Sequence, residues 1–261
     1  MSFNLKPHSA NALAFAQCNY LTMHFYKTYQ RPLAIGFDLD DTLYDNQPVL
    51  AHAEQQLQQY LLQQFPKTKK LTLNDWLQLR LTAVVHQPSL AHDISLSRRV
   101  SIEQGLLSLG YSVDEAVMGS QRALSVFLQW RNKITITPNT LNTLTELGRQ
   151  FRLFVISNGN ADIHKLGLGH LFEFALHPNQ HCPMKPAQCL FTQAQQRLAL
   201  PQQSILYIGD HPISDIVGAN NAGWQSGWYN PTQQLIQHRK GSLQLPTFEL
   251  STITQLKQLL K

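Results

Sequence analysis

Three acidic residues, Asp38, Asp40 and Asp41, lie within four positions, directly behind the apolar run 33–37. Like charges held this close repel each other, so the arrangement is unfavourable unless a cation or a shared proton offsets it. An apolar strand that ends in Asp-x-Asp-x-Thr brings both carboxylates to the carboxyl edge of a sheet, where open α/β folds bind their ligands. The pattern therefore indicates a metal-assisted site.

Three further polar sites accompany apolar runs or a helical pattern. Ser157 and Asn158 follow residues 153–156, Lys185 precedes a helix, and Asp210 and Asp215 follow residues 205–208. A carboxylate can attack phosphorus, and a transferred phosphoryl group needs a lysine, a hydroxyl, an amide and Mg²⁺ to balance its charge. Together the four sites predict phosphoryl transfer.

Taken singly, three of these sites have plainer interpretations. Ser157 and Asn158 could cap a helix, Lys185 could be a surface lysine, and Asp215 could be a charge favoured at a helix N-terminus. The order of the sites along the chain favours the chemical interpretation.

The elements that must position these residues alternate between strand and helix. Strands are predicted at 33–37, 153–156, 173–176, 205–208 and 226–229, and helices at 139–147, 186–198, 214–222 and 252–260. Alternation of this kind indicates an α/β fold with a parallel sheet and right-handed crossovers.

The interval 45–137 lacks any strand-like run and is predicted to hold four helices. Apolar residues recur there at helical spacing, Gly110 is suited to end the third helix, and Ser112 and Glu115 form a capping-box signature for the fourth. The prediction is an all-α module inserted after the first strand.

Composition narrows the classes of partner. The net charge is +5, but the basic residues are scattered, whereas a nucleic-acid-binding face needs them clustered with aromatic residues. No apolar stretch approaches the ~20 residues that cross a bilayer. The three cysteines, Cys18, Cys182 and Cys189, suggest neither a metal site nor a disulfide framework, so we expect a reducing cytoplasm.

The order Asp-x-Asp-x-Thr, Ser-Asn, Lys-Pro and Gly-Asp-x-x-x-x-Asp resembles the four motifs of the haloacid dehalogenase superfamily of phosphatases. The resemblance runs from about residue 33 to the C-terminus and implies a Rossmann-like three-layer core with a helical C1 cap. It implies a Mg²⁺ cofactor and the following roles: Asp38 as nucleophile and metal ligand, Asp40 as general acid and base and as a metal ligand, Asp210 as metal ligand, Ser157, Asn158 and Lys185 as phosphate-binding residues, and Thr42 and Asp215 as supporting residues.

Further segments, among them residues 37–46, 101–104 and 158–161, resemble bacterial members that dephosphorylate flavin mononucleotide and 5-amino-6-(5-phospho-D-ribitylamino)uracil. This resemblance implies a small phosphate ester as substrate. We accordingly expect an extension at 1–22, a core at 23–44 and 138–261, and a cap at 45–137.

Several alternatives remain open. A phosphomutase, a dehalogenase, a signalling receiver or an inactive phosphate-binding protein could use parts of the same site. Arg98 and Arg99 could contact substrate or lie on a solvated helix face, and Tyr44, Trp130 and Arg131 could stack on a planar ring. A zinc site at His177, His181 and Cys182 is disfavoured by its spacing.

Overall fold

The structure is a computed structural model, and it describes residues 23–234 and 244–261. The predicted extension 1–22 lies outside the described residues. No helix in the described ranges is long and apolar enough to span a membrane.

One sheet runs through the described part of the chain, with strands in the order β1-β7-β6-β5-β2-β3-β4. The strands are β1 (His24–Phe25), β2 (Ala34–Phe37), β3 (Arg152–Ile156), β4 (Ala175–Leu176), β5 (Ile205–Gly209), β6 (Gln225–Tyr229) and β7 (Phe248–Leu250). Every neighbouring pair is parallel except β1 with β7. The predicted parallel sheet is confirmed, although the sequence analysis missed the edge strand β1 and its neighbour β7.

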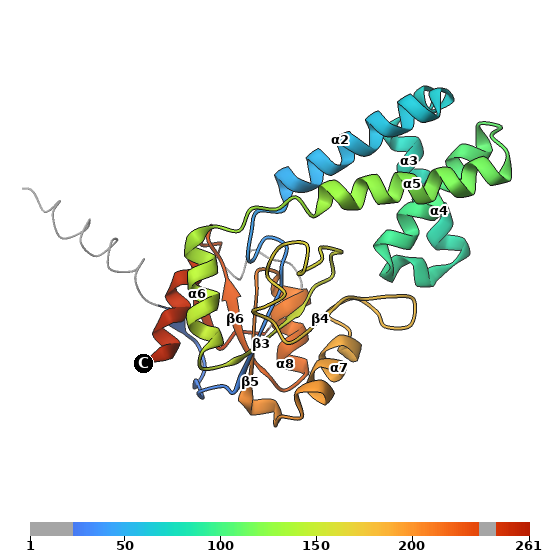
Figure 1. Ribbon diagram of the computed structural model, residues 1–261. Coiled ribbons are helices and arrows are strands. Elements are labelled where there is room, and N and C mark those ends of the chain that lie inside the picture. Colours follow the sequence, from blue (N-terminus) through green and yellow to red (C-terminus); the bar gives the residue numbers. More distant parts are fainter. Residues whose placement is uncertain (1–22, 235–243) are drawn as a thin grey trace, which may run out of the picture.

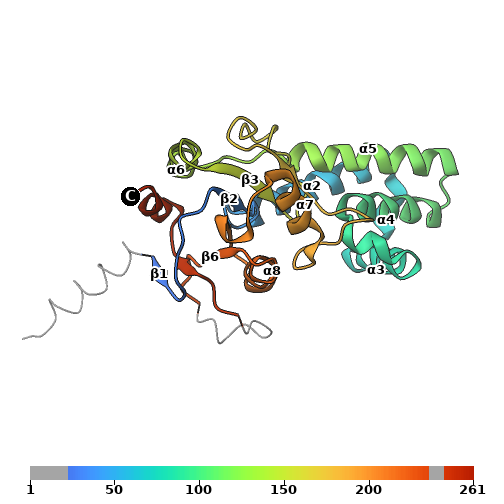
Figure 2. The ribbon, with the colours of Figure 1, turned by 90° about the horizontal axis from the view of Figure 1, so that it is seen from below.

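Helices cover both faces of this sheet, as Figures 1 and 2 show. They are α6 (Pro138–Gly148) and η6 (Ile253–Leu260) on one face and α7 (Gln188–Leu198) and α8 (Gly218–Asn221) on the other, with the short turns η3 (Gln202–Ser204) and η4 (Pro212–Val217) between strands and helices. The result is a three-layer α/β fold, in agreement with the expected fold class.

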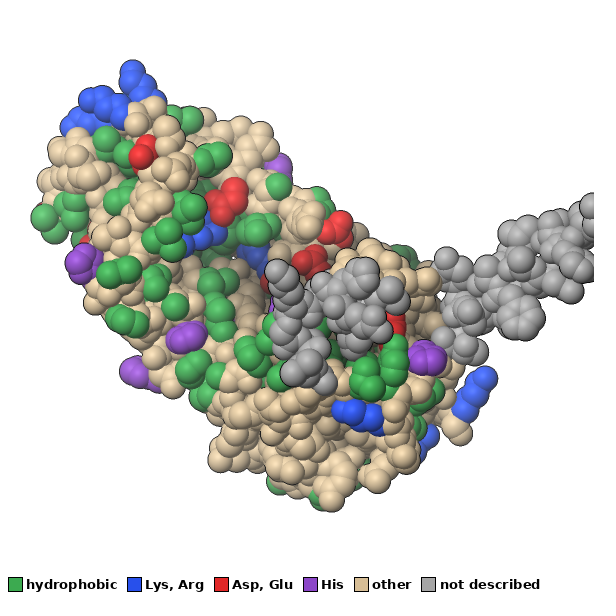
Figure 3. Space-filling view, turned by 180° about the vertical axis from the view of Figure 1, so that it is seen from behind, with side chains coloured by type: hydrophobic (Ala, Val, Ile, Leu, Met, Phe, Trp, Pro, Cys, Tyr) green, Lys and Arg blue, Asp and Glu red, His purple; other side chains and the backbone are tan. Residues whose placement is uncertain are grey.

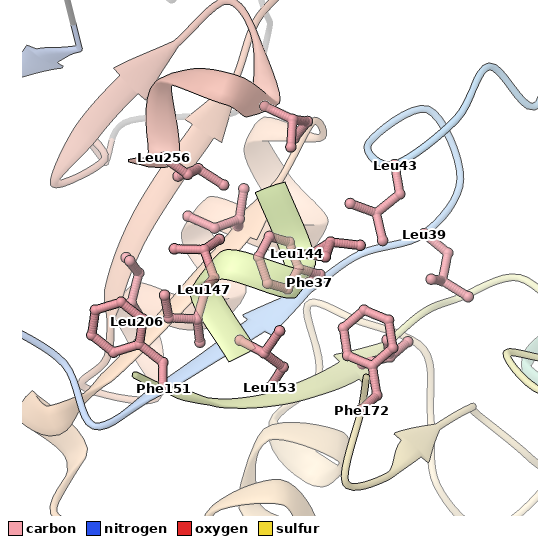
Figure 4. Packing of buried hydrophobic residues seen from close by; sticks show 14 of the residues in the cluster. Phe37, Leu39, Leu43, Leu144, Leu147, Phe151, Leu153, Phe172, Leu206 and Leu256 are labelled. Atoms are coloured by element: carbon pink, nitrogen blue, oxygen red, sulfur yellow. The ribbon is translucent and has the colours of Figure 1, made fainter. Parts of the chain in front are cut away.

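The side chains of the central strands alternate between two apolar cores. Leu153 and Val155 of β3 pack with α6 and η6, whereas Phe154 and Ile156 pack with α7. Strand geometry requires this alternation, because successive side chains point to opposite faces. Figure 4 shows the first core, with Leu144 and Leu147 of α6 packed beside Phe37 of β2.

The four predicted helices between β2 and α6 are present. They are α2 (Gln47–Gln64), α3 (Leu73–His86), α4 (Ile94–Ser108) and α5 (Val113–Arg131), with the short turns η1 (Pro66–Lys70) and η2 (Pro88–His92). Gly110 has a φ of +75°, and Ser112 and Glu115 form the predicted capping box of α5. The helices enclose a core of their own and extend to one side of the sheet (Figure 1). We call them the helical module.

The prediction that the cysteines form no disulfide is wrong. Cys182 and Cys189 are bonded to each other, with Cα atoms 5.6 Å apart. The chain turns back between them, so that a tight turn at Cys182 meets the first turn of α7. A separation of seven residues matches no framework that sequence alone identifies. The argument from cysteines for a reducing compartment therefore fails, and a cytoplasmic location stays a prediction.

Candidate active site

The ends of β2, β3 and β5 bring the predicted site together. Parallel register pairs Phe37 with both Val155 and Ile208, so the residues that follow these strands emerge at one edge. The backbone N–H of Asp38 donates to the carbonyl of Ile208 at 2.9 Å, which fixes the start of the first loop. Segments more than a hundred residues apart in sequence therefore meet at the carboxyl edge of the sheet.

Lys185 lies at the centre of this edge and is not a surface lysine. Its side chain is 1% exposed, and its Nζ donates to Asp38 Oδ1 at 2.9 Å and to Asp215 Oδ1 at 2.7 Å. The same atom lies 2.6 Å from the hydroxyl of Tyr207 and 2.8 Å from the carbonyl of Ile156. These contacts satisfy the buried ammonium and aim its charge at two carboxylates.

Asn158 supports the lysine through the backbone. Its Oδ1 accepts from the N–H of Lys185 at 2.8 Å, and its Nδ2 donates to the carbonyl of Lys185 at 3.0 Å. Ser157 is buried, and its Oγ accepts from the N–H of Gly159 at 3.1 Å, which leaves the hydroxyl proton available for another acceptor. The plainer interpretation, a helix cap at Ser157 and Asn158, is wrong because no helix begins at these residues.

Three carboxylates offer a place for a divalent metal. One oxygen from each of Asp38, Asp210 and Asp215 lies within 4.8 Å of the others. Asp215 already accepts from Lys185 with Oδ1 and from the N–H of His211 with Oδ2 at 2.9 Å. Its oxygens are therefore less available than those of Asp38 and Asp210. Three negative charges face one lysine, and this imbalance of two charges fits a divalent cation.

Burial controls the titration of this cluster. It raises the pKa of Asp38 to about 8, although the charge of Lys185 opposes the shift. Burial, with the charges of Asp215 and Asp41, raises the pKa of Asp210 to about 7. Burial alone would lower the pKa of Lys185, but the charges of Asp215 and Asp38 outweigh it and raise that pKa well above its usual value. The lysine therefore stays charged, and a nearby cation would stabilise the ionised form of the carboxylates.

Asp40 occupies a different environment from Asp38. Its Oδ1 accepts from Nη2 of Arg131 and from the hydroxyl of Tyr44, each at 2.5 Å. A Cβ added to Gly159 would lie 2.1 Å from the other oxygen, Oδ2, so the bare backbone of Gly159 permits this approach. The two predicted carboxylates therefore have separate partners.

Thr42, Asp215 and His211 each form hydrogen bonds that hold the loops of the site. The hydroxyl of Thr42 donates to Asp210 Oδ1 at 3.3 Å, which links the loops after β2 and β5. Asp215 is 1% exposed and pairs with Lys185, and it also lies in the first turn of η4, so it is a charge at a helix N-terminus that supports the lysine as well. His211 accepts from the N–H groups of Ile213 and Ser214 and thereby begins η4.

Arg98 and Arg99 lie in α4 and are already paired. Arg98 is buried against the ring of Phe127, with its guanidinium 3.7 Å from the ring centroid, and it pairs with Glu54. Arg99 pairs with Glu103 one turn along the helix. The contacts of Arg98 join α4 to α2 and α5, whereas the pair of Arg99 lies within α4. A substrate contact by either arginine stays a prediction.

Zinc is not supported at the second group of candidate ligands. Cys182 is bonded to Cys189, and Nδ1 of His177 lies 2.9 Å from the carbonyl of Gly159. Burial lowers the pKa of His177. The disulfide removes the thiolate that a zinc site would need, and among the described residues the group that could hold a metal ion is Asp38, Asp210 and Asp215.

Sequence reasoning missed three residues of the site. Tyr207 was assigned only to a strand, and Tyr44 and Arg131 only to ring stacking, yet all three bind charged site atoms. A polar aromatic residue in a fully apolar strand is a weak signal for Tyr207. Figure 3 shows acidic and basic side chains close together where the helical module meets the sheet domain.

Buried carboxylates around one lysine at the carboxyl edge of a parallel sheet define a hydrolase of the phosphoryl-transfer type. Residues 33–223 match the family of haloacid dehalogenase-like hydrolases. The chain belongs to this family, and it is a phosphatase by its similarity to curated members.

Two curated relatives are phosphatases. The 5-amino-6-(5-phospho-D-ribitylamino)uracil phosphatase YigB of Escherichia coli (strain K12) is 34% identical over 238 residues, which cover 91% of this chain and 100% of that protein. The glyceraldehyde 3-phosphate phosphatase of Methanothermobacter thermautotrophicus is 26% identical over 87% of this chain and 97% of that protein.

Solved structures share the fold. The crystal structure of 2-haloacid dehalogenase from Pseudomonas syringae pv. Tomato DC3000 has a TM-score of 0.83 and 35% identity, over 88% of this chain and 98% of that chain. L-2-haloacid dehalogenase from Xanthobacter autotrophicus has a TM-score of 0.56 at 19% identity, which shows the fold alone.

Proposed function

We propose that this phosphatase is Mg²⁺-dependent and hydrolyses a small-molecule phosphate monoester through an aspartyl phosphate on Asp38. One observation carries the proposal: the buried ammonium of Lys185 contacts both Asp38 and Asp215 beside Asp210. A lysine in that position neutralises charge on the nucleophile and on an incoming phosphoryl group at once.

In the first step a carboxylate oxygen of Asp38 attacks phosphorus, and the bond from phosphorus to the ester oxygen breaks. Asp40 donates a proton to that oxygen, which leaves as an alcohol. In the second step Asp40 takes a proton from a water molecule that attacks phosphorus, and the bond between phosphorus and Asp38 breaks. The products are free phosphate and the regenerated carboxylate.

Ser157 and Lys185 bind the phosphoryl oxygens in this proposal, and Asn158 supports them. The hydroxyl of Ser157 keeps its proton free to donate, and Lys185 supplies the positive charge. Asn158 contributes through the loop that it stabilises, because both ends of its side-chain amide already bind the backbone of Lys185. Thr42 and Asp215 keep Asp210 and Lys185 in place.

The metal ligands are the carboxylates of Asp38 and Asp210 and the backbone carbonyl of Asp40. Hard oxygen donors and an excess of negative charge fit Mg²⁺, which keeps several waters and needs few protein ligands. When bound, Mg²⁺ supplies positive charge to the phosphoryl oxygens. Asp215 supports the site through Lys185.

For the substrate we propose 5-amino-6-(5-phospho-D-ribitylamino)uracil, flavin mononucleotide or both. The similarity to YigB over all of that protein supports the first compound. Another sugar or nucleotide phosphate is the alternative, since a more distant relative is a glyceraldehyde 3-phosphate phosphatase.

We propose further that residues 45–137 are a cap that closes over the site, joined to a core of residues 23–44 and 138–261. We expect a small-molecule partner, with no nucleic acid and no membrane, and a cytoplasmic location. Limited proteolysis with and without substrate tests the cap, because a closing cap becomes protected in the segments that join it to the core.

A screen of phosphorylated metabolites tests the activity. Released phosphate is measured with Mg²⁺ and with a chelator for the two proposed substrates, glyceraldehyde 3-phosphate and a pyrimidine nucleotide. We expect Mg²⁺-dependent phosphate release, and Asp38→Asn should abolish it while the protein stays folded. Retained turnover in that variant would remove Asp38 as the nucleophile, and an isomerised ester in place of free phosphate would identify a phosphomutase.

A dehalogenase is the second candidate, because the structure with a TM-score of 0.83 carries that name. A dehalogenase needs the first aspartate but no proton donor at Asp40 and no phosphate-binding residues. Chloride release from a 2-haloacid, without phosphate release from any ester, would favour this candidate.

A further inference from the structure

We propose that Arg131 and Tyr44 are positioning residues for Asp40: together they hold Oδ1, so that Oδ2 is the oxygen that exchanges a proton with the leaving group. We call this pair the Asp40 clamp. The inference rests on the proposed function, in which Asp40 is the general acid. It assigns a role to two residues that the four sequence motifs do not include.

The geometry of the clamp is specific to one oxygen. Nη2 of Arg131 and the hydroxyl of Tyr44 both donate to Oδ1 of Asp40 at 2.5 Å, and Nη1 and Nη2 of Arg131 each lie 3.5 Å from that hydroxyl. Oδ2 lies instead beside Gly159, where a Cβ would approach it to 2.1 Å. Two donors on Oδ1 fix the plane of the carboxyl group, and the absence of a side chain at Gly159 lets Oδ2 lie close against the backbone there.

Burial makes the clamp rigid. The side chain of Arg131 is 2% exposed, that of Asp40 is 19% exposed, and Tyr44 is buried. An arginine keeps its charge in proteins, and burying a charge is unfavourable unless a partner compensates it. Arg131 therefore has a strong electrostatic reason to stay on Asp40, while Asp40 retains enough exposure to meet a substrate.

The two donors also lie in the two segments of chain that connect the sheet to the helical module. Tyr44 lies three residues before the first residue of α2, and Arg131 is the last residue of α5. Asn132, the residue after Arg131, accepts from the N–H of Asp162 at 2.7 Å, which joins this connecting segment to the loop after β3. A change in the orientation of the helical module would move both donors, so the position of the Asp40 side chain depends on that orientation.

A purely structural ion pair would have a different consequence from a clamp on a general acid. Loss of a structural pair lowers stability and affects all substrates alike. Loss of the clamp matters most for esters whose leaving group departs as a poorly stabilised alkoxide, because only these depend strongly on the proton from Asp40. The nitrophenolate ion is stable without that proton.

The experiment compares kcat/KM for p-nitrophenyl phosphate, benzyl phosphate and flavin mononucleotide, because kcat/KM includes the step in which the leaving group departs. The variants are Arg131→Met and Tyr44→Phe, with Asp40→Asn as reference. Arg152→Met is the control, since Arg152 pairs with Glu173 and is 39% exposed. Melting curves establish that each variant is folded.

We expect Arg131→Met to lose at least about tenfold more kcat/KM on benzyl phosphate and flavin mononucleotide than on p-nitrophenyl phosphate. Tyr44→Phe should show the same trend with a smaller loss, Asp40→Asn a larger one, and Arg152→Met none. If Arg131→Met fails to fold, Tyr44→Phe decides by the same comparison.

Equal losses on all three esters, or no loss, would overturn the clamp and leave Arg131 as a structural residue. A wild-type enzyme that releases phosphate from none of the three esters, nor from any metabolite of the screen, would overturn the proposed function and the clamp with it. The two failures are therefore distinguishable.

Discussion

Replacement of Lys185 by methionine tests the electrostatic basis of the site. The substitution keeps an unbranched side chain of similar length and removes only the ammonium. In the wild-type protein that ammonium contacts Asp38 Oδ1, Asp215 Oδ1, the Tyr207 hydroxyl and the Ile156 carbonyl, all within 2.9 Å. After the substitution Asp38 and Asp215 lose the one cation that the structure shows paired with them.

Removing one partner of a buried ion pair costs about 3–5 kcal/mol, because the remaining charge stays buried without compensation. The exposed pair of Lys257 and Glu146 has a similar N···O distance of 2.7 Å, with side chains 37% and 38% exposed. Lys257→Met should therefore cost no more than about 1 kcal/mol. The two variants remove the same group at nearly the same distance and differ mainly in burial.

Urea unfolding at pH 8 with a chelator, followed by circular dichroism, gives the free energy of unfolding of both variants. We expect Lys185→Met to lose several times more stability than Lys257→Met. The difference should shrink at pH 5, since protonation removes the unpaired negative charge. A loss for Lys185→Met that is no larger than that of the control would refute the claim that Lys185 balances the buried carboxylates.

Three further predictions follow from the same geometry. Asp40→Asn should lower the turnover rate on alkyl phosphates on the order of 10²–10⁴-fold, measured as phosphate release. Gly159→Ala should lower kcat while the protein stays folded, because the new methyl group meets Oδ2 of Asp40; an unchanged kcat would count against this contact. Without metal, the pKa of Asp38 is about 8 and that of Asp210 about 7, against 3.8 for both groups in the unfolded chain. Protonation of these two carboxyl groups therefore stabilises the folded state, and the full effect is present only below pH 3.8. That stability is lost as pH rises through 7–8, so Tm should fall from pH 5 to 8.5 with a chelator, and Mg²⁺ should raise Tm more at the higher pH.

The sequence was most informative where one physical rule links many residues. Parallel strands end at a common edge, so polar residues behind apolar runs could be expected to meet, and Asp38, Ser157, Lys185 and Asp210 do lie together. The helical module was predictable for a similar reason, since helical spacing and the Ser112 capping box are local signals.

The contacts that sequence reasoning missed are those without a local signal. Arg131 and Asp40 are 91 positions apart, and no spacing rule connects the last residue of a helix to a strand-end carboxylate. The strands β1 and β7 have two and three residues, which is too short for an alternating pattern to be visible. The Cys182–Cys189 disulfide depends on the turn between the two residues, which the sequence does not specify.

The Asp-x-Asp spacing separates two carboxylates that would otherwise compete for one role. Asp38 lies within the charge cluster of Lys185 and Asp210, whereas Asp40 lies with Arg131 on the side of the helical module. Each carboxylate therefore has its own cation, and in the proposed function the attacking carboxylate, Asp38, is the one that lies with Lys185 and Asp210. The other, Asp40, is held by Arg131 and Tyr44 in the segments that lead to the helical module, where closure of the proposed cap would reach it. In the proposed function, environment rather than residue type therefore divides the nucleophile from the acid.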